Sequence, residues 1–315
     1  MTKVQYIDSH SHFFPEKYLK TLDELGIRFG QILDQRFTSL SSRLADMDKA
    51  GISKQVISVA VPDVNTSTPG NAVQLARIVN DELSNLTNEN ERFTGLASLP
   101  MLDPDTAVEE LDRAINDLGL RGVQLFTDIG GRSLDREEFW CVYERVARLD
   151  VPVFIHPIAP AHRVVYDDYN LLSVLGFPFE TTHAATRIVL IGLLEKLPKL
   201  KLVLSHLGGT LPYLVGRIDD AYRMFWKSQT KITKPPSEYF KKMYLDGASF
   251  YEPAWNTALG LWTPDKILMG SDYPYGWVDD YNNCVDVVKS LSLSDADQGL
   301  ILGDNAEKLL GLGRE

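Results

Sequence analysis

Cysteine is scarce in this sequence, with Cys141 and Cys284 as the only two in 315 residues. Two cysteines cannot build a disulfide framework or a cysteine-rich metal site, and such scarcity favours a reducing cytoplasm. No stretch approaches the roughly 18 uninterrupted apolar residues that a membrane span needs. The first residues lead into a polar motif and not into a basic-then-apolar leader. We therefore expect a cytoplasmic protein with no membrane segment and no signal peptide.

Basic residues are also in deficit, since 32 Lys and Arg face 43 Asp and Glu, giving a formal net charge of -11 and a pI near 5.1. This balance argues against nucleic acid or an anionic membrane surface as a partner. A small anionic substrate remains compatible with it, because a bound cation or one arginine sets the local field. No linker rich in Pro, Gly or Ser divides the chain, so we expect a single domain over residues 1–315.

Eight short runs of apolar and β-branched residues recur along the chain and predict strands. They lie at 4–8, 55–61, 93–99, 122–127, 152–156, 201–206, 243–249 and 267–271. Helical patterns separate them at 69–87, 104–118, 135–149, 181–196, 210–225, 254–262, 279–291 and 294–310. Asp103 and Asp135 are the expected start signals of two of these helices. The alternation predicts an α/β fold, a (β/α)₈ TIM barrel, with an open doubly wound sheet as the alternative.

The placement of the histidines is the main functional signal, since four of the six fall at predicted strand ends. His10 and His12 stand two residues apart at the end of the first strand, where alternate side chains share one face. His156 closes the fifth strand, His206 closes the sixth and Asp272 follows the eighth. The carboxyl ends of barrel strands meet at one rim, so these five side chains are expected at a single site.

Each of these residues also has an ordinary structural interpretation. A lone His-x-His pair is weak evidence of a metal site, and a histidine at a strand end often makes only hydrogen bonds. Asp272 could cap the turn before Pro274. Their coincidence at strand ends favours a metal site instead. His162 and His183 do not share that position and are expected in a loop or helix, where either could line a substrate pocket.

Three histidines and one aspartate suit Zn²⁺, Mn²⁺ or Fe²⁺ better than Mg²⁺ or Ca²⁺, which prefer oxygen ligands. We expect one divalent ion, with Zn²⁺ as the first choice. An open coordination position would mark the site as catalytic.

Several motifs together resemble the amidohydrolase superfamily and, within it, the branch of 2-amino-3-carboxymuconate 6-semialdehyde decarboxylase. The resemblance covers nearly the whole chain. Its motifs are IDSHSHFFP at 7–15, MDKAG at 47–51, FIHP at 154–157, GFPFETT at 176–182, LSHLGG at 204–209, GSDYP at 270–274 and NAE at 305–307. Arg217 lies between LSHLGG and GSDYP.

The resemblance implies specific roles for these residues. It implies that His10, His12, His156 and Asp272 bind one metal ion and that His206 is an unligated base. Binuclear relatives carry a bridging lysine at the end of the fourth strand, whereas this chain has Leu-Phe-Thr-Asp at 125–128, so one ion is expected.

The resemblance also implies a homodimer, in which Arg217 binds a substrate carboxylate in the neighbouring subunit's site. Without the resemblance, Arg217 would be an ordinary exposed helix residue.

This chain departs from the branch in two places. Residues 16–42 form a shorter segment than in the semialdehyde decarboxylase, without a counterpart of that enzyme's second substrate-binding arginine. Related phenolic-acid decarboxylases begin with Glu-x-His where this chain has His10-Ser11-His12.

The expected function is metal-dependent, non-oxidative decarboxylation of a small aromatic or dienoic carboxylic acid. The metal would act as a Lewis acid, His206 as general base, and His206 or Asp272 would protonate the substrate carbon. One alternative is hydrolysis of a lactone, amide or ester at the same site. The other is a binding or sensor barrel without catalytic activity.

Overall fold

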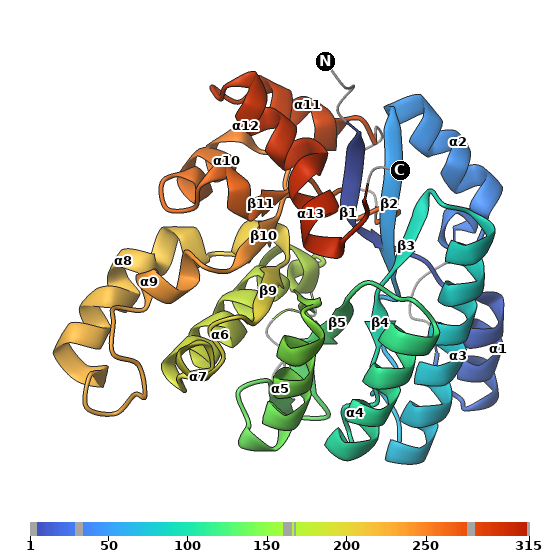
Figure 1. Cartoon of the computed structure of the whole chain (residues 1–315), viewed down its shortest axis with the longest axis horizontal. Helices are drawn as coiled ribbons and strands as arrows, with labels where there is room; N and C mark the ends of the chain where they lie inside the picture. The colour runs from blue at the N-terminus through green and yellow to red at the C-terminus, as the bar shows by residue number, and fades with distance from the viewer. Residues whose placement is uncertain (1–4, 29–33, 160–165, 167, 276–280, 314–315) are drawn as a thin grey trace.

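Short parallel strands form a sheet that closes into a barrel (Figure 1). The computed structural model describes residues 5–28, 34–159, 166, 168–275 and 281–313. The barrel strands are β1 Tyr6–His12, β2 Ile52–Ser58, β3 Phe93–Gly95, β4 Ala97–Ser98, β5 Val123–Phe126, β8 Pro152–His156, β9 Lys201–Leu204, β10 Tyr244–Asp246 and β11 Ile267–Leu268. β3 and β4 follow one another at one strand position, where β3 pairs with β2 and β4 pairs with β5.

Hydrogen bonds between β1 and the segment after β11 close the barrel. The amide of Ser9 donates to the carbonyl of Met269 at 2.9 Å, and the amide of His12 donates to the carbonyl of Tyr273 at 2.7 Å. The strands between these two edges pair in the order β1-β2-β3 and β4-β5-β8-β9-β10-β11, all in parallel. The predicted (β/α)₈ barrel is therefore confirmed, and the open sheet is excluded.

Helices surround this barrel. They are α1 Glu16–Glu24, α2 Leu40–Ala50, α3 Pro69–Glu89, α4 Pro104–Asp112, α5 Trp140–Leu149, α6 Phe177–Leu190, α7 Leu193–Lys196, α8 Leu211–Ala221, α9 Ser237–Phe240, α10 Glu252–Leu259, α11 Asn283–Ser290, α12 Asp295–Gly299 and α13 Asn305–Leu310. Single π-helical turns extend four of these segments, at η2 Arg113–Asp117, η5 Leu172–Gly176, η7 Tyr222–Trp226 and η9 Leu300–Asp304. Single 3₁₀ turns lie at η1 Gln35–Phe37, η3 Glu137–Phe139, η6 His206–Gly208 and η8 Pro264–Lys266.

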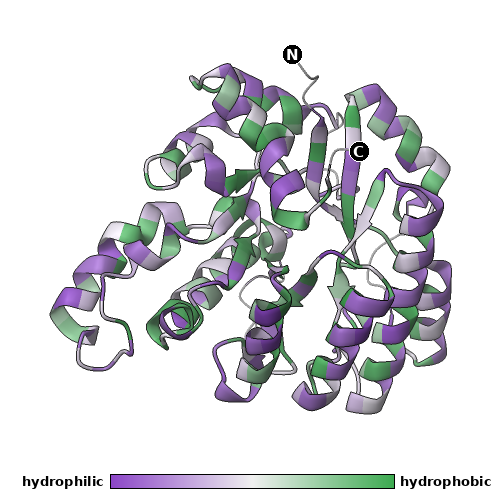
Figure 2. Ribbon diagram, in the orientation of Figure 1, coloured by the Kyte–Doolittle hydropathy of each residue, from purple (hydrophilic) through white to green (hydrophobic). Residues whose placement is uncertain are grey.

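Most helices in Figure 2 carry hydrophilic and hydrophobic residues together, as expected of helices that cover a buried sheet. Within the described residues, no helix combines the length and apolarity that crossing a membrane would require.

Two of the predicted helix starts have different outcomes. The Asp103 side chain accepts a hydrogen bond from the amide of Thr106, as predicted for the N-cap of α4. Asp135 does not cap a helix, because α5 begins at Trp140 and the Asp135 carboxylate instead forms two hydrogen bonds with Arg187 of α6, at 2.7 and 2.8 Å. The first two residues of the helix predicted at 279–291 lie outside the described residues, and α11 begins at Asn283.

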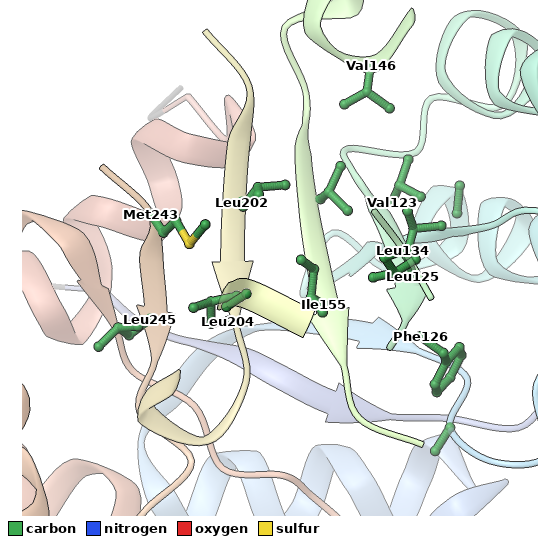
Figure 3. Packing of buried hydrophobic residues seen from close by; sticks show 14 of the residues in the cluster. Val123, Leu125, Phe126, Leu134, Val146, Ile155, Leu202, Leu204, Met243 and Leu245 are labelled. Atoms are coloured by element: carbon green, nitrogen blue, oxygen red, sulfur yellow. The ribbon is translucent and has the colours of Figure 1, made fainter. Parts of the chain in front are cut away.

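Two apolar layers pack against the sheet, one outside the barrel and one inside it. The outer layer lies between strands and helices, and Figure 3 shows Ile155, Leu202 and Leu204 of the neighbouring strands β8 and β9 within it. The inner layer takes one residue from each of several strands and three from α13, which packs against it. Its buried members are Ile7, Val56, Leu96, Phe154, Val203, Leu268, Ala306, Leu309 and Leu310.

The inner layer determines where the polar side chains go, because side chains alternate between the two faces of a strand. His156 follows Phe154 by two residues, Ser58 follows Val56 and Asp246 follows Tyr244, which packs against the same layer. The barrel interior is therefore apolar at the inner layer and polar nearer the carboxyl ends of the strands.

Candidate metal centre

A bulge in β1 turns His10 and His12 toward the barrel interior. Ile7 belongs to the inner apolar layer, and strict alternation from there would send His10 outward. Asp8 and Ser11, three residues apart, both lie on the outer side, near Gln55, which accepts a hydrogen bond from Arg43. The register shift between Asp8 and Ser11 makes this possible, since a bulge inserts one extra residue.

Four of the five predicted side chains bring ligand atoms into one small space. Nitrogen atoms of His10, His156 and His206 and a carboxylate oxygen of Asp272 all lie within 4.8 Å of one another. His12 joins this group, because its Nε2 lies 3.0 Å from Nε2 of His10 and 3.2 Å from Oδ1 of Asp272. All five residues predicted for the rim are thus at one site.

The atoms at the centre of this group fit a cation. Oδ1 of Asp272 is buried and makes no hydrogen bond within the described residues, although Nε2 of His10 lies only 3.3 Å away. Imidazole nitrogens and a carboxylate oxygen that converge in this way are the donor set expected for a divalent ion. Geometry alone would also allow His206 as a ligand in place of His12.

An acceptor on the far side of the ring orients each of two histidines. Nδ1 of His10 lies 2.8 Å from Oδ2 of Asp246, and Nδ1 of His156 lies 2.8 Å from the carbonyl oxygen of Pro157. A proton on Nδ1 leaves a lone pair on Nε2, which is the form that binds metal. Asp246 also accepts from the amide of His206 at 2.9 Å, so this one carboxylate holds two members of the site.

Burial and charge set the pKa values of the metal-free site. Burial by itself would lower the pKa of His10, but the carboxylates of Asp246, Asp272 and Asp8 raise it to about 9. Burial lowers the pKa of His12 to about 4 and that of His156 well below its usual value. Burial by itself would raise the pKa of Asp272, but the neighbouring imidazoles of His12, His206 and His10 hold it well below its usual value. At neutral pH the metal-free site therefore holds the Asp272 carboxylate, the neutral imidazoles of His12 and His156, and a protonated, positively charged His10.

Two residues of the site have left-handed backbone conformations. φ is +56° at His206 and +60° at Asp272, which costs free energy for residues other than glycine. φ stays positive through Leu207, Gly208 and Gly209, and a Cβ at Gly209 would meet the carbonyl oxygen of Pro178 at 2.1 Å. Such strain concentrates at functional sites, where the surrounding structure holds it in place.

Solvent reaches the site from the side of His206 and Asp272. Their side chains are 18% and 15% exposed, whereas His10 and His12 are 4% and 0% exposed. A substrate entering from the rim would therefore meet His206 and Asp272 first.

Aromatic rings flank the histidines. The ring centroid of Phe126 lies 5.5 Å from that of His156, and Phe177 lies 6.2 Å from the same ring. Tyr275 lies 5.4 Å from His12. Phe177 and Tyr275 are partly exposed, so both can contact a bound molecule.

The other predicted residues lie elsewhere. Arg217 is exposed on α8 and makes no hydrogen bond or ion pair with any described residue. His183 is exposed on α6, and His162 lies outside the described residues.

Sequence reasoning missed Asp246, although it ends β10 and so meets the strand-end criterion that selected the other residues. It also missed Ser58, whose hydroxyl lies beside Nδ1 of His12, and Gln124, which accepts a hydrogen bond from that hydroxyl. Neither residue type carries a metal or catalytic signature, so no motif could have indicated them.

Comparisons with known proteins give the family to which the chain is similar. A family model described as Amidohydrolase matches residues 7–312. The chain is 28% identical to the 2-amino-3-carboxymuconate-6-semialdehyde decarboxylase of Dictyostelium discoideum, over 97% of this chain and 91% of the relative. It is 32% identical to the gamma-resorcylate decarboxylase of a Polaromonas species, over 95% of this chain and 98% of the relative.

A solved structure is similar to this chain over nearly its whole length. The crystal structure of a dihydroxybenzoic acid decarboxylase from Polaromonas, with bound manganese and the inhibitor 2-nitroresorcinol, matches with a TM-score of 0.86 and 29% identity. The match covers 99% of this chain and 98% of that one.

Proposed function

This chain belongs to the amidohydrolase family, and we propose that it is a metal-dependent, non-oxidative decarboxylase of a small aromatic carboxylic acid. The observation that carries the proposal is the convergence of His10, His12, His156 and Asp272 beside the more exposed His206. The relatives named above are decarboxylases, which favours this reaction over hydrolysis and over a barrel without activity.

Four residues would hold one divalent ion, namely His10, His12, His156 and Asp272. The ion would supply Lewis acidity at an oxygen substituent beside the carboxylate. Three imidazoles favour Zn²⁺, while the related dihydroxybenzoic acid decarboxylase contains manganese. Metal analysis of the purified protein distinguishes the two ions.

His206 would move the proton, because it is the most exposed imidazole of the site and its Nε2 lies 3.8 Å from Oδ2 of Asp272. One of these two groups would deliver a proton to the ring carbon that bears the carboxylate. The bond from that carbon to the carboxylate then breaks, and CO₂ leaves while the new C–H bond remains. Phe177 and Tyr275 would orient the substrate ring, because their aromatic side chains flank the site. Contacts between aromatic rings favour an aromatic substrate over a dienoic one.

Arg217 would bind the substrate carboxylate of a neighbouring subunit in a homodimer. It lies on an exposed helix surface with Tyr213, Met224 and Phe225, which are 83%, 70% and 61% exposed. Large exposed apolar side chains on one helical segment indicate an interface, and Figure 1 shows α8 at the periphery of the molecule. This surface would be the dimer contact that carries Arg217 into the partner's site.

We further propose one domain for the whole chain and a cytoplasmic location. The family match from residue 7 to residue 312 supports the first. The two free cysteines, Cys141 and Cys284, support the second.

The test is a substrate screen with metal-reconstituted protein, using hydroxybenzoates, pyrimidine carboxylates and muconate semialdehydes as candidates. Release of CO₂ from a hydroxybenzoate, lost on chelation and restored by added metal, is the expected result. Ring-opened product from a lactone without CO₂ would favour the hydrolase. A protein that neither contains nor takes up a divalent ion would contradict the proposed function.

A further inference from the structure

A chain of buried hydrogen bonds lies behind His12, inside the barrel. Nδ1 of His12 lies 3.3 Å from Oγ of Ser58, and the Ser58 hydroxyl donates to Oε1 of Gln124 at 2.6 Å. Nε2 of Gln124 in turn donates to the carbonyl oxygen of Val59. The three side chains are 0%, 3% and 5% exposed, so these contacts are shielded from water.

The direction of each bond in this chain follows from the donors available. The carbonyl of Val59 can only accept, so the amide NH₂ of Gln124 faces it and Oε1 faces Ser58. A serine hydroxyl has one proton, and the 2.6 Å contact to Gln124 engages it in preference to the carbonyl oxygen of Ser11, which lies 3.3 Å away. Oγ of Ser58 can then only accept from His12, which requires the proton on Nδ1 of His12. Nε2 of His12 consequently carries a lone pair.

The other tautomer would leave these partners mismatched. A proton on Nε2 of His12 would lie between Nε2 of His10, 3.0 Å away, and Oδ1 of Asp272, 3.2 Å away, and Nδ1 would then need the Ser58 proton. Oε1 of Gln124 would lose its donor, and an unsatisfied buried acceptor costs about 1–3 kcal/mol. This relay, the hydrogen-bonded chain of His12, Ser58 and Gln124, therefore favours the tautomer of His12 whose Nε2 is free to bind a cation.

The two polar residues also occupy unusual positions. Branched apolar side chains usually fill the interior of such a barrel. Ser58 follows the inward-facing Val56 by two residues, and Gln124 lies between Val123 and Leu125, both of which pack in the outer layer. Replacing apolar residues here by serine and glutamine has a desolvation cost, so the pair indicates a role for its hydrogen bonds.

We propose that Ser58 and Gln124 are positioning residues, which hold His12 in the Nδ1-protonated form with Nε2 directed at the metal. The inference rests on the proposed function only in taking His12 as a ligand. The tautomer itself is a property of the metal-free protein and is testable without any metal.

The first experiment measures that tautomer. Long-range proton–nitrogen NMR on metal-free protein with labelled histidine, with His12 assigned by a His12→Asn variant, distinguishes the two nitrogens. Protonated Nδ1 is expected in the wild type. In Gln124→Met, the freed Ser58 hydroxyl is expected to donate to Nδ1 and to increase the Nε2-protonated fraction. Protonated Nε2 in the wild type would overturn the proposal.

The second experiment measures metal affinity by competition with a chromogenic chelator, using Zn²⁺ and Mn²⁺ in turn. Ser58→Ala and Gln124→Met are expected to bind about 10–100-fold more weakly, which is typical of partners behind a metal ligand. Ser58→Thr, which keeps the hydroxyl, is expected to restore most of the affinity.

Ser84→Ala is the matched control for this measurement. Ser84 is a buried serine on α3 whose hydroxyl donates to the carbonyl of Leu118, and its loss should leave affinity unchanged. Wild-type affinity in folded Ser58→Ala or Gln124→Met protein would overturn the relay. A wild type that binds no metal would contradict the proposed function instead, while the NMR result would still decide the tautomer.

Discussion

The carboxylate of Asp246 bridges two parts of the site, because Oδ2 lies 2.8 Å from Nδ1 of His10 while Oδ1 accepts from the amide of His206 at 2.9 Å. One side chain at the end of β10 thus orients His10, a proposed metal ligand, and holds the backbone of His206, the proposed base.

Asp246→Asn should weaken metal binding by about 10–100-fold, because a neutral amide no longer orients His10 or raises its basicity. Competition with a chelator measures the change. Asp220→Asn, at an exposed carboxylate that pairs with Arg223, is the control and should bind normally. Equal affinity in the two variants would exclude a role for Asp246 in the metal site.

Metal affinity should rise with pH up to about 9. The pKa of His10 is about 9 in the metal-free protein, so below that value an ion must displace its proton. His12 and His156, with lowered pKa values, release none at neutral pH. We expect affinity to fall about tenfold for each pH unit below 9, with one proton released per ion. Calorimetry in buffers of different ionisation enthalpy counts the protons, and a count of zero would contradict the assignment.

His206→Ala should keep the metal and lose turnover. Removing a general acid or base typically lowers kcat by about 10²–10⁴-fold. The measurements are metal content after dialysis and the rate of CO₂ release. His183→Ala, at an exposed histidine on α6, is the control. If metal is lost together with activity, His206 is a ligand and the proposed set is wrong.

Arg217→Ala should lower kcat/KM by about 10–100-fold, the effect of losing about 1.5–3 kcal/mol from hydrogen bonds to a charged group. Mixing this variant with His206→Ala tests whether Arg217 acts across subunits. In a mixed dimer, the site that keeps His206 would receive Arg217 from its partner, so activity should return. An unchanged low rate after subunit exchange would place Arg217 outside the neighbouring site.

The five residues that converge at the candidate site were predictable because their chemistry is local in the sequence. A histidine or aspartate at the end of an apolar run carries its own signal, and barrel geometry brings such ends together. That signal predicted all five members of the site. It also predicted the N-cap at Asp103, where the carboxylate meets an amide three residues away.

The failures share a different cause. Asp135 looked like a helix cap, but its carboxylate found Arg187, 52 positions away, a partner that no local pattern contains. The bulge in β1 similarly depends on pairing with β2, which begins 40 residues after β1 ends, at Ile52.

The sequence by itself determined the fold class, the ligand types and the rim on which they stand, because periodicity and residue chemistry suffice for these. Only the tertiary structure decided which face His10 and His12 present and which hydrogen-bond partner lies behind each ring. Those choices depend on Asp246, Ser58 and Gln124, which come from other strands. Their hydrogen bonds join residues far apart in the chain, and only the closed barrel brings them within reach.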